Sequence, residues 1–203
     1  MNEQREFCLK IKGAVEELQK TPLPPDYMRN AEQYLSVKFV ESLYGSHIRC
    51  NELISEFDTV LDIGSGINFY SRINPNVTTS NPCERGIGVQ ELYRFINGKL
   101  QCPVDVDLFD INNNDRWIDT EETFEAVIAH RFLPWHHKPF TRDTYKRFLR
   151  ETYRVLRPGG TLFYYTNHSD IFFNVAGKER YIWGEARNKF FKTTKEKLSE
   201  VLE

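Results

Sequence analysis

A short apolar segment that runs directly into two glycines constrains the fold of this chain more than any other feature of its sequence. Residues 59–63 read Thr-Val-Leu-Asp-Ile, and Gly64, Ser65 and Gly66 follow at once. Glycine lacks a Cβ atom, so it adopts positive φ values readily and lets a ligand approach the backbone. In open α/β sheets, ligands bind outside the C-terminal ends of the strands. We therefore expect a buried strand over residues 59–63 that leads into a ligand-binding turn.

Downstream of this turn, β-prone segments alternate with amphipathic ones. The pattern predicts strands over residues 76–80, 104–109, 124–129 and 161–166, and helices over residues 69–73, 91–96 and 141–156. Such alternation, with right-handed crossovers, predicts an α/β fold: a doubly wound, Rossmann-like, mostly parallel sheet with helices on both faces.

The segment before the first strand is expected to be helical. Its apolar spacing predicts helices over residues 3–20, from Asp26 through Phe39, and over residues 47–57. The chain thus divides into an N-terminal helical extension or lid over residues 1–58 and a ligand-binding domain over residues 59–203.

The spacing of the glycines separates two classes of nucleotide-binding turn. The dinucleotide fingerprint G-x-G-x-x-G/A needs a third small residue, and Phe69 stands at that position. The pattern that remains is D-x-G-x-G, formed by Asp62, Gly64 and Gly66. It resembles motif I of class I S-adenosylmethionine-dependent methyltransferases. A nicotinamide oxidoreductase is therefore disfavoured.

Two further segments carry the same resemblance. Residues 124–130 are similar to the fourth strand of that family, and residues 149–162 are similar to its last crossover helix, Pro-Gly-Gly turn and fifth strand. The resemblance implies S-adenosyl-L-methionine as cofactor and methyl transfer. The acceptor is unidentified: we expect a small molecule, with an exposed group of a larger partner as the other option. The alternative is a catalytically weakened, methyltransferase-like interaction subunit.

The resemblance also implies roles for residues of the turn. Asp62 would hold the turn and the amino-acid end of the cofactor. The backbone that lines the methionine moiety would come from Ile63, Gly64, Ser65 and Gly66.

The nucleoside would lie against the ends of the next two strands. The family usually places an acid at the ribose, where this chain has Asn81, with Glu84 as an alternative. An amide accepts one such hydrogen bond but loses the charge assistance of a carboxylate. Asp107 matches the acid that holds the adenine amino group, with Asp110 as a competitor, and Leu108 would supply a backbone contact to the ring.

Candidate catalytic residues follow the fourth strand. Methyl transfer is an in-line displacement, so a general base is needed only where the acceptor must lose a proton. Histidine titrates near neutrality, which makes His130 and His136 candidates, and the family position of His130 lies between cofactor and acceptor. His136 and His137 could equally be solvent-exposed loop residues, and no metal site is expected because no third ligand accompanies them.

Other predicted residues border the acceptor. Residues 131–135 replace the Asn/Asp-Pro-Pro-Tyr/Phe signature used for planar amide nitrogens, which disfavours that class of acceptor. Further side chains that could border or cap the acceptor pocket are Tyr27, Tyr34, Tyr164, Tyr165, Asn167 and His168.

The C-terminal segment departs from the family pattern. Residues 191–203 resemble the helix that the family places before a closing hairpin, and no hairpin follows. We therefore expect an uncovered sheet edge, through which the chain could pair with itself or with a partner, unless residues 171–183 cover it. A fragment is the other explanation.

Bulk properties narrow the partners. A net charge of −2 and a pI near 6.2 give no electrostatic case for a nucleic-acid or membrane surface. No run approaches the roughly 18 apolar residues of a membrane span. The four cysteines are far apart and form no C-x-x-C pair, so a reduced, cytoplasmic protein is the expectation.

Overall fold

Among the residues that the computed structural model describes, seven strands form one sheet. The structure describes residues 3–22, 31–82, 88–101, 106–108, 121–130, 142–165, 180–182 and 189–202. The strand order is β3-β2-β1-β4-β5-β7-β6. The strands are β1 (Val60–Ile63), β2 (Val77–Pro82), β3 (Val106–Leu108), β4 (Phe124–His130), β5 (Leu156–Tyr165), β6 (Arg180–Ile182) and β7 (Lys189–Thr194). Strands β1 to β5 are parallel, as predicted, and β7 is antiparallel to both of its neighbours.

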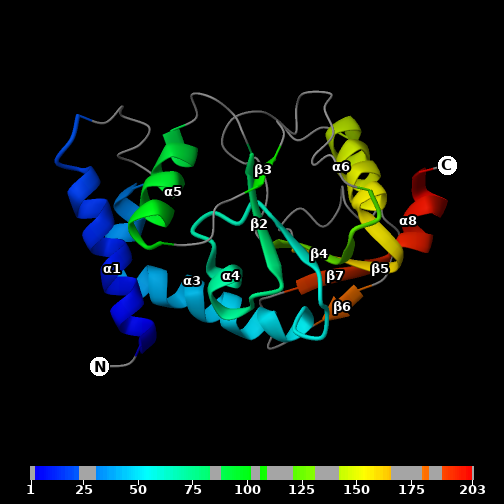
Figure 1. Ribbon diagram of the computed structural model, residues 1–203, viewed down its shortest axis with the longest axis horizontal. Coiled ribbons are helices and arrows are strands. Elements are labelled where there is room, and N and C mark those ends of the chain that lie inside the picture. The colour runs from blue at the N-terminus through cyan, green and yellow to red at the C-terminus, as the bar shows by residue number, and fades with distance from the viewer. Residues whose placement is uncertain are drawn as a thin grey trace.

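Helices cover both faces of this sheet, which confirms the predicted α/β class (Figure 1). They are α1 (Glu3–Leu18), α3 (Val37–Cys50), η1 (Asn51–Leu53), α4 (Phe69–Ile73), α5 (Gly88–Lys99), α6 (Arg142–Val155) and α8 (Lys195–Leu202). On one face, Ala126 and Ile128 of β4 share a buried cluster with Cys50 of α3 and Tyr70 of α4. On the other face, Tyr164 of β5 packs against Phe148 of α6, with ring centroids 5.3 Å apart.

The order in which strands are added to the sheet reverses at β1, so β2 and β4 lie on opposite sides of it. It moves outward from β1 through β2 to β3, then returns so that β4 lies on the other side of β1. In doubly wound sheets this switch point leaves a crevice at the C-terminal ends of the two central strands, where ligands bind. The glycine turn follows β1 directly at that place.

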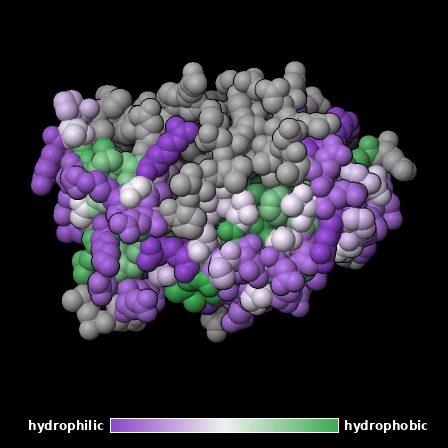
Figure 2. All heavy atoms as spheres, viewed as in Figure 1, coloured by the Kyte–Doolittle hydropathy of each residue, from purple (hydrophilic) through white to green (hydrophobic). Residues whose placement is uncertain are grey.

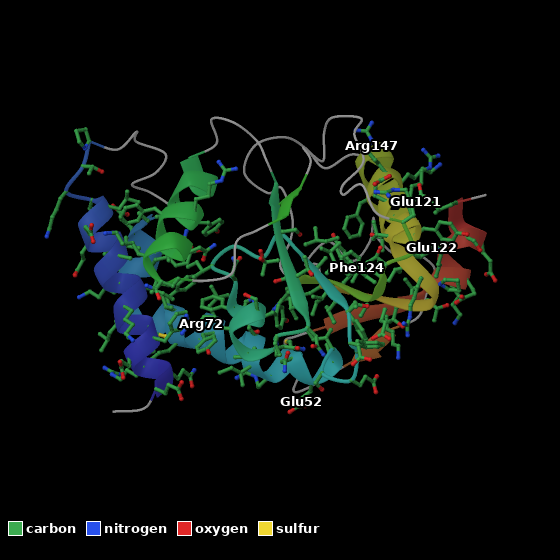
Figure 3. All side chains as sticks on the ribbon, in the orientation of Figure 1. Glu52, Arg72, Glu121, Glu122, Phe124 and Arg147 are labelled. Atoms are coloured by element: carbon green, nitrogen blue, oxygen red, sulfur yellow. The ribbon has the colours of Figure 1, made fainter. Side chains whose placement is uncertain are left out.

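The N-terminal helices share a core with the glycine-turn region. Phe7 and Ile11 of α1 belong to one buried cluster with Phe69 of α4 and Ile96 of α5. Figure 1 shows α1 and α5 side by side. In Figure 3, Arg72 of α4 lies among these helices, and its guanidinium carbon stands 3.8 Å from the centre of the Phe7 ring. The division of the chain at residue 58 stays a prediction.

Several helix boundaries differ from those predicted. The helix expected from Asp26 through Phe39 is divided at Ser36, whose extended backbone and side-chain oxygen cap α3 by accepting from the Phe39 amide. The third predicted helix shrinks to η1, because α3 continues to Cys50. Asp26 itself lies outside the described residues.

The predicted open edge beside β5 is wrong. Residues 189–194, whose last part was expected to begin a long helix, form β7, which pairs with β5 from Thr161–Thr194 to Tyr165–Phe190. Strand β6 pairs with the outer side of β7, and α8 begins only at Lys195. Residues 180–182, part of the segment proposed to cover β5, lie one strand further out, and residues 171–179 and 183 lie outside the described residues. The proposed pairing of two chains through an uncovered β5 edge therefore loses its basis.

The Pro-Gly-Gly segment, predicted as a turn before a strand over residues 161–166, lies inside β5 at an irregularity in its pairing with β4, and it joins three parts of the fold. Gly159 has φ +77°, and its amide donates to Glu196 Oε1 of α8 at 2.8 Å. A Cβ atom on Gly160 would lie 2.8 Å from the carbonyl oxygen of Arg157 and 3.2 Å from that of Glu125. Glu125 in turn pairs with Arg157 and accepts from the amide of Thr59, the residue just before β1. This part of β5 therefore requires glycine at both positions, and residue 160 has no room for a side chain.

We expect Gly160→Ala to destabilise the protein by about 1–3 kcal/mol, because the methyl group would displace two backbone carbonyls. Gly13→Ala is the matched control: Gly13 is exposed in the middle of α1, and a methyl group added there would have nothing within 4 Å. That variant should gain about 0.5–1 kcal/mol, since alanine favours a helix over glycine. Urea unfolding measures both, and equal stability of the two variants would contradict the packing described.

Burial also sets the reactivity of a cysteine in α1. Cys8 is fully buried, and this burial raises the pKa of its thiol to about 11. Because the thiolate is the reactive form, we expect Cys8 to alkylate at pH 8 roughly a hundred-fold more slowly in the native protein than in urea. Mass spectrometry of the alkylated peptides measures this, and rapid labelling of native Cys8 would show that α1 is not docked.

Candidate functional site

The turn after β1 is fixed to the end of β2. Gly64 and Gly66 have φ values of +71° and +58°, a region that side-chain-bearing residues rarely adopt. The amides of Gly64 and Ser65 both donate to the carbonyl oxygen of Ser80, at 2.8 Å and 3.0 Å. The Ser80 hydroxyl donates back to the carbonyl oxygen of Asp62 at 2.5 Å. A single β2 residue thus holds both sides of the turn.

A third residue of the turn is left-handed. Asn68 has φ +50°, is fully buried and precedes α4. Its amide donates to the Ser65 carbonyl at 3.0 Å, and its Oδ1 accepts from the Ser65 hydroxyl at 2.8 Å. Asparagine tolerates this backbone better than most residues. Asn68 was missed from the sequence, although an Asn just after two glycines signals such a turn.

Helix α5 supports the turn from the opposite side. Asn97 Nδ2 donates to the Gly66 carbonyl at 2.9 Å. The other end of this amide, Oδ1, is buried and has no hydrogen-bond partner in the described structure. No sequence motif marks Asn97, because the contact joins residues 31 positions apart.

The positions predicted to bind a nucleoside lie at one edge of the sheet. Asp62 is 2% exposed in β1 and stands in register with Thr79 of β2. Two residues further along β2, Asn81 stands in register with Asp107 of β3, and Pro82 stands opposite Leu108. The structure therefore brings these backbone positions together beside the turn. The alternatives Glu84 and Asp110 lie outside the described residues.

His130 ends β4, across the switch point from the turn, and its side chain is 5% exposed. Its Nδ1 lies 2.8 Å from the hydroxyl of Tyr70, and its Nε2 lies 3.5 Å from that of Ser46. The ring also contacts His47, with centroids 4.3 Å apart. These contacts tie β4 to α3 and α4.

The predicted acceptor-side residues divide into two groups. Tyr164 is fully buried against α6, Tyr165 packs against His130, and Tyr34 is 8% exposed beside α5. Lying outside the described residues are Tyr27, residues 131–135, His136, His137, Asn167 and His168.

The described residues were also compared with what a metal site and a membrane-spanning helix require. Within the described ranges, no three His, Cys, Asp or Glu side chains converge as metal ligands would. The helices of the same ranges include none with the length and apolarity needed to cross a bilayer. Among the coloured residues of the face in Figure 2, most are hydrophilic and the apolar ones form separate groups.

Comparison with known proteins relates the fold to methyltransferases. No family model and no curated protein sequence matches the chain. Among solved structures, a methyltransferase from Pyrococcus furiosus superposes with a TM-score of 0.54 at 15% identity, over 77% of this chain and 84% of that one. The S-adenosylmethionine-dependent methyltransferase SibL in its apo form gives 0.53 at 12% identity, over 93% and 69%. TrmN from Thermus thermophilus gives 0.51 at 16% identity, over 74% and 47%.

These likenesses show the fold. The chain spans most of the Pyrococcus furiosus protein but only about half of TrmN. The strand order separates this fold from the dinucleotide-binding fold. A dinucleotide-binding sheet continues past β5 with a parallel strand, whereas here the neighbour of β5 is the antiparallel β7.

Proposed function

We propose that this chain binds S-adenosylmethionine at the turn after β1 and transfers its methyl group to a small-molecule acceptor. The observation that carries the proposal is the turn itself, in which Gly64 and Gly66 are left-handed and lie at the switch point between β1 and β4. The fold shared with methyltransferases supports it.

The residues present fit such a cofactor. Asn81 and Asp107 stand opposite each other on neighbouring strands, about 4.8 Å apart in a sheet, so a ribose and its base could contact one strand each. The cofactor carries positive charge on its sulfonium and amino groups. Two groups beside the turn could attract these positive charges. They are the carboxylate of the buried Asp62 and the amide oxygen Oδ1 of Asn97, which is buried and has no hydrogen-bond partner in the described structure.

When bound, S-adenosylmethionine would supply an electrophilic methyl group on its sulfonium, open to in-line displacement. The chain's own residues then have to hold the acceptor in line and exclude water. In our proposal Asp62 and the backbone of residues 63–66 fix the methionine end, Asn81 holds the ribose, and Asp107 with Leu108 holds the adenine.

The two candidate histidines receive different roles. Both ring nitrogens of His130 face hydroxyls, those of Tyr70 and Ser46, so we propose that it shapes the acceptor side of the switch point and positions β4. Proton removal, where the acceptor requires it, would fall to His136.

Calorimetric titration with S-adenosylmethionine and S-adenosylhomocysteine tests the proposal. We expect both to bind the wild-type protein. Asp62→Asn should weaken binding at least about ten-fold, because a buried charge-assisted interaction is lost. Gly64→Val should abolish it, because a β-branched residue is strongly disfavoured at φ +71°. Asp58→Ala, an exposed acid just before β1, is the control that should bind normally.

Thermal melting must show that each variant is folded. Folded wild-type protein that binds neither compound would refute the enzyme and favour the interaction subunit.

The amide at the ribose position gives a gain-of-affinity prediction. Asn81→Asp would replace one neutral acceptor by a carboxylate that can accept from both hydroxyls of a ribose. We expect S-adenosylhomocysteine to bind about five-fold more tightly, since charge-assisted hydrogen bonds are the stronger kind. Titration of adenosine provides the control: it has the same ribose, so its affinity should rise by the same factor. Unchanged affinity for both compounds would remove Asn81 from the site.

A further inference from the structure

Two tyrosines from distant parts of the chain meet beside Gly66. Tyr34 lies in the helical segment 31–35, and Tyr93 lies in α5. Their hydroxyl oxygens are 3.0 Å apart, and their rings meet edge to face with centroids 6.1 Å apart. Burial raises the pKa of both phenols above the ordinary value, so at neutral pH this is a hydrogen bond between two neutral groups.

The Tyr93 ring also lies against the turn. Three of its ring carbons stand 3.6–3.8 Å from the place where a Cβ of Gly66 would be. Asn97, one helical turn further along α5, donates to the Gly66 carbonyl. The same face of α5 thus contacts Gly66 through a ring on one side and a hydrogen bond on the other.

Tyr34 belongs to the core of the N-terminal helices. It is 8% exposed, its ring meets that of Phe39 edge to face at 6.1 Å, and it shares a buried cluster with Phe7 and Ile11 of α1. The hydroxyl pair therefore forms a polar link between this cluster and the helix face that holds Gly66.

We propose that Tyr34 is a positioning residue that, through Tyr93, couples docking of the N-terminal helices to the conformation of the glycine turn. Docked helices keep the Tyr93 ring against Gly66 and hold the turn in its ligand-binding form. By the reciprocity of binding linkage, a ligand on the turn in turn stabilises the docked helices. The inference rests on the proposed function only in taking the turn as the cofactor site.

The test is a double-mutant cycle. Tyr34→Phe and Tyr93→Phe each keep the ring and remove the hydroxyl link. Each should weaken S-adenosylhomocysteine binding about five-fold in titration calorimetry, and the double variant should lose no more than either single one. Losses that multiply in the double variant, or unchanged affinity in the singles, would overturn the proposal.

Tyr44→Phe is the matched control. Tyr44 is buried in the same cluster and stacks on Phe69, but its hydroxyl bonds to Arg72 instead of Tyr93. It should lower the melting temperature as much as Tyr34→Phe does while leaving the affinity unchanged. An equal loss of affinity in Tyr44→Phe would mean that general loosening of the core is responsible, and the coupling would be rejected.

Hydrogen exchange separates this inference from the proposed function. With S-adenosylhomocysteine bound, amides of residues 31–35 and α1 should gain protection in the wild type and gain less in Tyr34→Phe. If the wild type binds no cofactor, exchange of the free protein decides: amides of residues 64–68 should exchange faster in Tyr34→Phe than in Tyr44→Phe. Equal exchange in those two variants would refute the coupling whatever the cofactor does.

Discussion

The carbonyl oxygen of Ser80 holds the glycine turn, and the remaining features of the candidate site depend on it. It accepts from the amides of Gly64 and Ser65, while the hydroxyl of the same residue donates to Asp62. Because Ser80 is the residue of β2 just before Asn81, the turn and the predicted ribose position are set by one stretch of strand. Any shift in the register between β1 and β2 would displace both.

Features with local causes were predictable from the sequence. The turn after β1 and the Pro-Gly-Gly segment of β5 are marked by glycines that the backbone itself demands, since Gly159 has φ +77° and Gly160 has no room for a Cβ. The β5 edge was not predictable in the same way. Thr193 and Thr194 resemble the entry to a helix, and only pairing with Leu162 and Thr161 of β5 makes them a strand.

The residues that support the turn from distant parts of the chain belong to no recognisable sequence motif. Asn97 and Tyr93 were missed because an amphipathic helix such as α5 has a polar residue or a tyrosine at many positions, and nothing local distinguishes those that touch Gly66. The N-terminal helices were predicted as an extension or lid. In the structure they share a hydrophobic cluster with α4 and α5, so the same side chains pack against the N-terminal helices and against the two helices that flank the turn.

The strain in the turn explains why so many contacts converge on it. Gly64, Gly66 and Asn68 are all left-handed within five residues, and for Asn68 that backbone costs about 1 kcal/mol. Such a turn persists only where its surroundings hold it, which Ser65, Ser80 and Asn97 do through hydrogen bonds. These contacts come from the protein alone, so they hold the turn in shape before any ligand arrives. Preorganisation of this kind lowers the cost of ordering the turn when a ligand binds.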